Sequence, residues 1–93
     1  MTDIKEQQAG PIEVWLSKKN IEVTCIIVRE DETTSPRDVD SLSMRGAQRE
    51  MTGWLIGLGY APAGRWSAEE EDRDGAVIES MRQFKPADGA VAI

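Results

Sequence analysis

Residues 40–66 read DSLSMRGAQREMTGWLIGLGYAPAGRW, and this stretch decides the fold. Its apolar residues recur at helical spacing, which predicts an amphipathic helix starting near Asp40 or Ser41. Either residue can cap the helix, and acidic residues near its start complement the positive end of the helix dipole. The predicted buried stripe consists of Leu42, Met44, Ala47, Met51, Trp54, Leu55 and Leu58. Gly59 is placed to end the helix, and Pro62 prevents its continuation.

Two segments before the helix alternate in the manner of β-strands. Residues 12–19 place apolar side chains at every second position, and residues 21–29 are apolar on one side and partly apolar on the other. The second segment is therefore predicted to be a central strand, joined to the first by a turn. A competing interpretation makes residues 11–19 a short helix with Pro11 at its first position. The β-branched content of this region favours the strand.

The remaining segments complete a small α+β domain. Residues 30–38 are predicted to be a polar loop, residues 60–67 a short strand, and residues 76–84 a strand with no cleanly apolar face. Such mixed faces are typical of an edge strand. The predicted fold is a small antiparallel β-sheet in the order ββαββ, with one amphipathic helix packed on one face.

Length and composition predict one domain with a polar N-terminal end and a C-terminal end rich in small residues. With 93 residues, the chain is expected to form a single α+β domain over residues 11–85, with flexible tails at residues 1–10 and 86–93. Residues 1–10 carry no apolar core of the kind a secretory signal needs, and no apolar run approaches the ~20 residues of a membrane span. The single cysteine excludes an internal disulfide, so we expect a cytoplasmic protein. The excess of arginine over lysine, seven to four, is associated with a bacterial source.

The net charge of −6 bears on the choice of partner. Like charges repel phosphate backbones and anionic lipid, so the charge disfavours nucleic acid and membranes as partners of the whole chain. A local basic surface is still compatible with the sequence, because four arginines lie between the acidic clusters: Arg37, Arg45, Arg49 and Arg65. These arginines are candidate phosphate or nucleic-acid contacts.

No residue pattern predicts catalysis, a metal or a cofactor. The sequence lacks histidine, which removes the commonest general base and the commonest metal ligand. Cys25 lies within an apolar run and is predicted to be packed in the core. Residues 70–75 imitate the first half of a calcium loop, but the twelfth position is Met81 where that loop needs glutamate. We therefore expect a non-enzymatic protein without a cofactor.

Three glycines interrupt the predicted helix: Gly46, Gly53 and Gly57. Each lowers helix stability by up to ~1 kcal/mol relative to alanine. One interpretation is that the helix lies unusually near its own sheet. The other is a close contact between helices across a dimer.

Trp15 points away from its apolar neighbours if the first strand packs on the helix. Together with Ile26 and Val28 it then forms an apolar patch on the outer side of the sheet. Such a patch on a small domain is typical of a protein interface. Our leading hypothesis is an interaction or regulatory domain that pairs with itself as a homodimer, or with another protein, through Trp15, Ile26 and Val28. The alternative is a nucleic-acid-associated regulator that uses the arginines.

Overall fold

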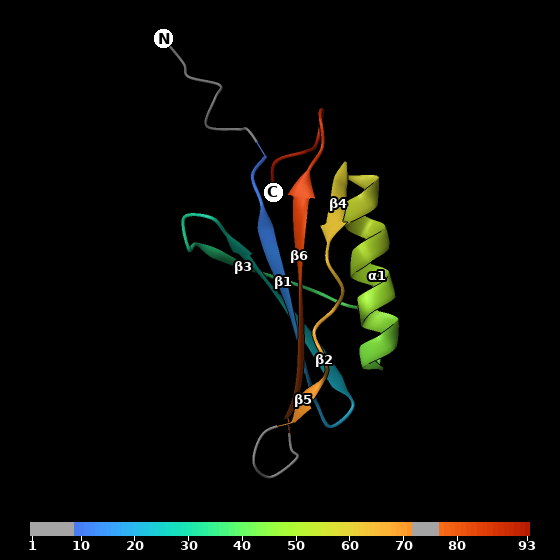
Figure 1. The fold of residues 1–93 in the computed structure, drawn as a ribbon. Coiled ribbons are helices and arrows are strands. Elements are labelled where there is room, and N and C mark those ends of the chain that lie inside the picture. The colour runs from blue at the N-terminus through green and yellow to red at the C-terminus, as the bar shows by residue number, and fades with distance from the viewer. Residues whose placement is uncertain (1–8, 72–76) are drawn as a thin grey trace.

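The computed structural model describes residues 9–71 and 77–93, which form one helix and six strands (Figure 1). The flexible tail predicted for residues 1–10 therefore lies almost entirely outside the described residues. Residues 72–75 of the segment that resembles a calcium loop also lie outside them. The elements in chain order are β1 (Ile12–Lys19), β2 (Glu22–Arg29), β3 (Thr34–Arg37), α1 (Met44–Gly57), β4 (Tyr60–Ala63), β5 (Glu70–Glu71) and β6 (Val77–Pro86).

All strand pairs are antiparallel, and the spatial order is β3-β2-β1-β6-β4, with β5 also paired to β6. β4 and β5 lie along the same edge of β6, because they pair with residues 83–86 and 78–79 respectively. The chain between them stays close to β6, since the Ser67 amide donates to the Met81 carbonyl at 2.8 Å. The predicted α+β class is confirmed, whereas the order of elements is βββαβββ rather than ββαββ.

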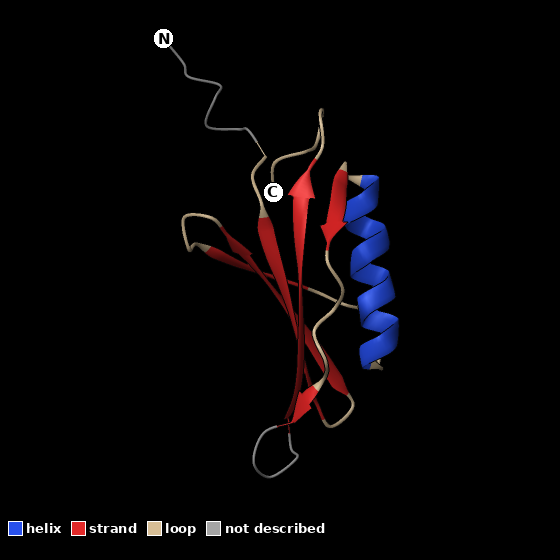
Figure 2. Cartoon of the chain, in the orientation of Figure 1, coloured by secondary structure: helices blue, strands red, loops and turns tan. Residues whose placement is uncertain are grey.

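The helix α1 lies on one face of the sheet, where it packs against β1 and β4 (Figure 2). It connects β3 at one edge of the sheet to β4 at the other. Ser43 caps its start by accepting a hydrogen bond from the Gly46 amide at 3.0 Å. The predicted start at Asp40 or Ser41 was too early, and Leu42 is 67% exposed rather than buried. Gly59, with φ of 95°, follows the helix in the left-handed conformation that glycine favours.

The hydrophobic core lies between α1 and the inner face of the sheet. Alternate residues of β1 and β2 point inward, and they meet Phe84 of β6 and four helix residues, Met44, Ala47, Met51 and Leu55. Residues 12–19 therefore form a strand, and the helical alternative for that segment is wrong. The alternation of β1 decides this, because a helix would spread Ile12, Val14 and Leu16 over different directions.

Several strands differ from expectation. β5 was not predicted, and β4 ends at Ala63 rather than at residue 67. β3 lies in the segment predicted to be a loop, where Pro36 occupies an outermost strand. β6 was predicted at the edge but is interior, because β1 pairs with one side of it and β4 and β5 with the other. Its inward Ser80, 1% exposed, remains satisfied since its hydroxyl donates to the Ser67 carbonyl at 2.8 Å. A buried polar residue of this kind made its face look solvent-exposed in the sequence.

The packed unit extends past residue 85, the boundary expected from the sequence. The Val91 amide donates to the Leu58 carbonyl at 2.9 Å, and the Tyr60 hydroxyl donates to the Val91 carbonyl at 2.8 Å. Arg29 Nε donates to the Ile93 main-chain oxygen at 2.7 Å. Residues 87–93 thus contact both the end of the helix and β2.

Candidate functional site

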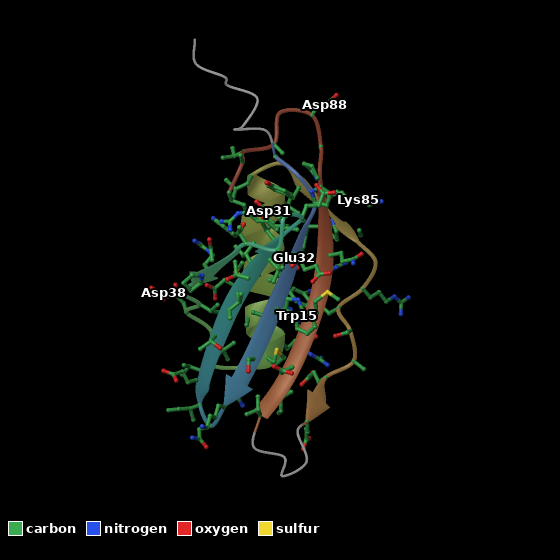
Figure 3. The ribbon with its side chains drawn as sticks, turned by 90° about the vertical axis from the view of Figure 1, so that its left-hand side faces the viewer. Trp15, Asp31, Glu32, Asp38, Lys85 and Asp88 are labelled. Carbon is green, nitrogen blue, oxygen red and sulfur yellow. The ribbon has the colours of Figure 1, made fainter. Side chains whose placement is uncertain are left out.

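The sheet surface turned away from α1, here called the outer face, carries an apolar row across four strands. The strand register places Pro36 of β3 opposite Ile26, Ile26 opposite Trp15, and Trp15 opposite Met81 of β6. Directly opposed residues share one face of a sheet, so these four side chains form a continuous row. Figure 3 shows this face toward the viewer, with Trp15 near its centre and α1 behind the strands.

The centre of the row is accessible to a partner. Trp15 is 40% exposed and Ile26 is 46% exposed, while Val28 is half-buried. The Trp15 indole Nε1–H donates to Glu13 Oε1 at 3.0 Å. This hydrogen bond occupies the polar edge of the indole, so the remainder of the ring is an apolar surface of fixed orientation. The structure places Trp15, Ile26 and Val28 on this one face.

A hollow of about 410 Å³ adjoins the row at the end of the sheet that holds the β2–β3 turn. Val28, Glu13 and Gln83 are among its lining residues, together with Glu32 of the turn and Lys85 of β6. Figure 1 shows that the β2–β3 end of the sheet bends away from α1. The outer face is consequently a curved surface with an apolar centre.

The charged residues that β1, β2 and β6 place on the outer face nearly balance one another. The register places three glutamates of β1, β2 and β6 on it (Glu13, Glu22 and Glu79) and two lysines (Lys19 and Lys85). The charges of these five residues sum to −1, against −6 for the whole chain. Repulsion between two copies of this face is therefore smaller than the net charge suggests.

The two edges of the sheet are poorly suited to pairing with another strand. The outermost strands β3 and β4 have four residues each, and each contains a proline, Pro36 and Pro62. Proline lacks the N–H that a further strand would need to pair. A short edge strand also offers few main-chain groups for pairing. The outermost strands β3 and β4 thus offer little for another strand to pair with.

The structure separates the four arginines predicted to contact phosphate. Arg37 lies over the Trp54 indole, with 3.5 Å between its Cζ and the ring centroid. Arg45 and Arg49 instead line a groove beside Thr52 and Trp66. Thr52 and Trp54 point in nearly opposite directions because residues two apart on a helix differ by about 200°. Arg65 is exposed and is not among the residues that line this groove.

Arg82 joins Arg45 and Arg49 in the groove, and the sequence did not single it out. Its position became meaningful only once β6 was known to pair with β1, which turns Arg82 toward the helix side of the sheet. Met81 and Pro36 were missed in the same way. Met81 lies in a segment whose alternation was visible, whereas Pro36 lies in a predicted loop. The register that aligns both residues with Trp15 was not visible in the sequence.

Cys25 is 2% exposed, and burial raises the pKa of its thiol from 9.0 to about 11, with nearby Arg37 partly opposing this. A thiol with such a pKa is almost wholly protonated at neutral pH and is a poor nucleophile. Over the described ranges 9–71 and 77–93, no group of three or more potential metal ligands is present. The calcium-like loop includes residues 72–75, which lie outside those ranges.

Comparison with protein-family models, with curated proteins and with solved structures finds no match to this chain. Within the described part of the chain, no helix has both the length and the apolar character needed to cross a bilayer.

Proposed function

We propose that this protein is a non-enzymatic interaction domain that forms a homodimer through its outer face, with Trp15, Ile26 and Val28 at the centre of the contact. The observation that carries the proposal is the apolar row of Pro36, Ile26, Trp15 and Met81, aligned across four strands and accessible at its centre. Contiguous apolar surface of this kind is typical of interaction sites, and tryptophan is enriched among the residues that dominate binding energy.

The geometry suits a face-to-face contact between two sheets. Sheets pack about 10 Å apart with their inner side chains interdigitated. In a two-fold symmetric dimer the same patch serves both protomers, so a centrally placed Trp15 contacts the partner's apolar row near the axis. The nearly balanced charges of the outward residues on β1, β2 and β6 permit this contact, and the prolines at both edges disfavour the competing edge-to-edge arrangement.

A role without catalysis is supported by the chemistry of the side chains. The sequence contains no histidine, and its single thiol is buried with a raised pKa. The buried hydroxyls of Ser80 and Tyr60 are hydrogen-bonded to main-chain carbonyls. These groups serve the fold rather than a reaction.

Sedimentation equilibrium of the wild-type protein and of Trp15→Ser tests the proposal. We expect a wild-type dimer and a dissociation constant raised about 30-fold or more in Trp15→Ser, the effect of losing a central interface residue. The matched control is Ile21→Ser, which also removes an exposed apolar side chain (74% exposed) but lies in the β1–β2 turn. It should leave the dissociation constant unchanged.

Two results would overturn this proposal. If Trp15→Ser melts the protein, Trp15 stabilises the fold and is not an interface residue. If the wild type is monomeric at millimolar concentration, the outer face does not form a homodimer, and a different protein would have to be its partner.

A further inference from the structure

A second surface, separate from the outer face, lies along the flank of α1. It is a groove of about 440 Å³, within the range of small-molecule sites, and we call it the arginine groove. Its lining includes Arg45, Arg49 and Thr52 of the helix, Trp66 of the chain after β4, and Arg82 of β6. Because these residues come from three separate parts of the chain, the groove exists only in the folded domain.

Several lining side chains are held in place by hydrogen bonds. Arg82 Nε donates to the Gly64 carbonyl at 2.8 Å, and the Trp66 indole Nε1–H donates to Thr52 Oγ1 at 3.3 Å. Gln48, which also lines the groove, donates from Nε2 to Ser80 Oγ at 3.2 Å. Side chains that are ordered before binding lose less conformational entropy when a ligand arrives.

The groove is positive on an acidic protein. Its lining residues include three arginines and no aspartate or glutamate. Glu50, the acid next to Arg49 in the chain, is engaged elsewhere, because its carboxylate accepts hydrogen bonds from the Asp40 and Ser41 amides at 3.0 Å. Among the residues that the structure describes, no carboxylate therefore lines the groove beside the three arginines.

We propose that the arginine groove binds a small phosphorylated ligand that carries a flat apolar group, the chemistry of a mononucleotide. Guanidinium groups bind phosphate through paired, charge-assisted hydrogen bonds. Trp66 and Ile56, both lining the groove, supply apolar surface for the rest of the ligand. The proposal is independent of the homodimer, since the outer face lies on the other side of the sheet.

The surrounding charge limits the size of the ligand. The exposed acids Glu69 and Glu71 follow Trp66 closely in the chain. The net charge of −6 opposes the binding of a long polyanion such as nucleic acid. The observations therefore favour one phosphate group on a small molecule over a nucleic-acid strand.

Titration of the full chain with adenosine monophosphate, followed by ¹H–¹⁵N NMR, tests the proposal. We expect a saturable shift of the Trp66 indole N–H signal, with the Trp15 signal unchanged. Inorganic phosphate should compete, and adenosine without phosphate should bind at least about 10-fold more weakly, the scale of a lost charged hydrogen bond.

Charge-matched variants locate the site. Arg49→Gln and Arg45→Gln should each weaken adenosine monophosphate binding about 10-fold. Arg65→Gln removes the same charge from an exposed position outside the groove and should change affinity less than about twofold, the scale of an unfocused surface charge. Both helix arginines are exposed, so their replacement should leave the fold intact.

Three outcomes would overturn the proposal. One is the absence of any shift at low salt, and another is equal binding of adenosine and adenosine monophosphate. The third is a single-stranded oligonucleotide that binds more tightly than the monophosphate and loses affinity equally in Arg65→Gln and Arg49→Gln. That pattern indicates a diffuse nucleic-acid surface in place of a small-ligand site.

Discussion

The guanidinium of Arg37 stacks on the Trp54 indole, with its Cζ 3.5 Å from the ring centroid. Its Nε is buried without a hydrogen-bond partner among the described residues. A desolvated cation over a tryptophan face contributes up to about 2 kcal/mol, and the arginine stem adds apolar packing. Arg37 therefore has a structural role that its place among the four candidate phosphate contacts did not suggest.

We predict that Arg37→Ala lowers the free energy of unfolding by about 1–2 kcal/mol, because it removes this stacking and the associated packing. Urea denaturation measures the change. Arg65→Ala, which removes the same charge from an exposed position, should leave the free energy of unfolding unaltered. Equal losses in the two variants would mean that charge alone, and not the stack on Trp54, is responsible.

Glu50 joins the helix to the chain that precedes it. Hydrogen bonds from the Asp40 amide, together with the hydroxyl and amide of Ser41, hold the pKa of the Glu50 carboxyl below its ordinary value of 4.5. A carboxyl whose pKa is lowered by folding stabilises the folded state above its unfolded pKa. That contribution disappears as pH falls from about 4.5 through the lower, folded value.

Glu50→Gln should accordingly lower the free energy of unfolding at pH 7 by about 1 kcal/mol, the scale of losing a capping interaction. The difference from wild type should shrink as pH falls below 4.5. Thermal unfolding at a series of pH values measures this difference. The control is Glu69→Gln, which makes the same change of charge in an exposed loop. A difference that stays constant with pH would show that the carboxylate charge is not what stabilises the turn at residues 40–41.

At the scale of elements, the structure tests the two explanations that the sequence left open for the three glycines of α1. A Cβ atom added to Gly53 or Gly57 would meet nothing within 4 Å, so neither glycine permits a close approach to the sheet. A Cβ added to Gly46 would lie 2.9 Å from Ser43 Oγ, the atom that caps the helix. The interpretation that all three glycines bring the helix near its own sheet is wrong.

We predict that Gly53→Ala raises the free energy of unfolding by about 0.5–1 kcal/mol, since alanine forms helix better and the site is open. Gly46→Ala should give no such gain, because its methyl group crowds the capping serine. Chemical denaturation of both variants provides the comparison. Sedimentation of Gly53→Ala adds a second test, because a weakened dimer would place the contact between protomers on the helix and not on the outer face.

A helix or strand can be predicted from the sequence when the pattern that specifies it lies within its own residues. The helix body and the strands β1 and β2 follow from periodicity, since each buries one coherent apolar side. β3 was missed because Pro36 and polar neighbours resemble a loop, although a proline suits an outermost strand. The interior position of β6 depends on pairing with β1 and β4, which no pattern within its ten residues encodes.

The residues of the two candidate surfaces likewise differ in whether a local pattern could predict them. Trp15, Ile26 and Val28 were assignable to one face from alternation alone. Adding Met81 and Pro36 required the register of the sheet. The arginine groove combines Arg45 and Arg49, whose helical spacing was visible, with Arg82, which pairing of β6 brings to the helix side.

At the scale of the whole molecule, residues 87–93 connect elements that are distant in sequence. Val91 forms hydrogen bonds with Leu58 at the end of the helix and with Tyr60 at the start of β4. Ile93 accepts a hydrogen bond from Arg29 of β2. Gly59 makes room for this segment, since a Cβ there would lie 2.8 Å from Ala90 Cα. The segment therefore closes the end of the core beyond β4 and β6.

Deleting residues 87–93 should lower the free energy of unfolding by about 2–4 kcal/mol, because at least three hydrogen bonds and the apolar contacts of Ala90 and Ile93 are lost together. Tyr60→Phe removes only the hydrogen bond to Val91 and should cost about 1 kcal/mol. Urea denaturation of both variants, with hydrogen exchange at the Val91 amide, distinguishes a docked segment from a flexible tail. If truncation leaves stability unchanged and the Val91 amide exchanges at the rate of an unfolded peptide, residues 86–93 are the flexible tail that their small residues and preceding proline predict, and the core ends at β6. If the amide is protected and Tyr60→Phe reduces that protection, the segment is part of the domain. Its contact with Arg29 then links the end of α1 to β2, which β1 and β6 separate from β4.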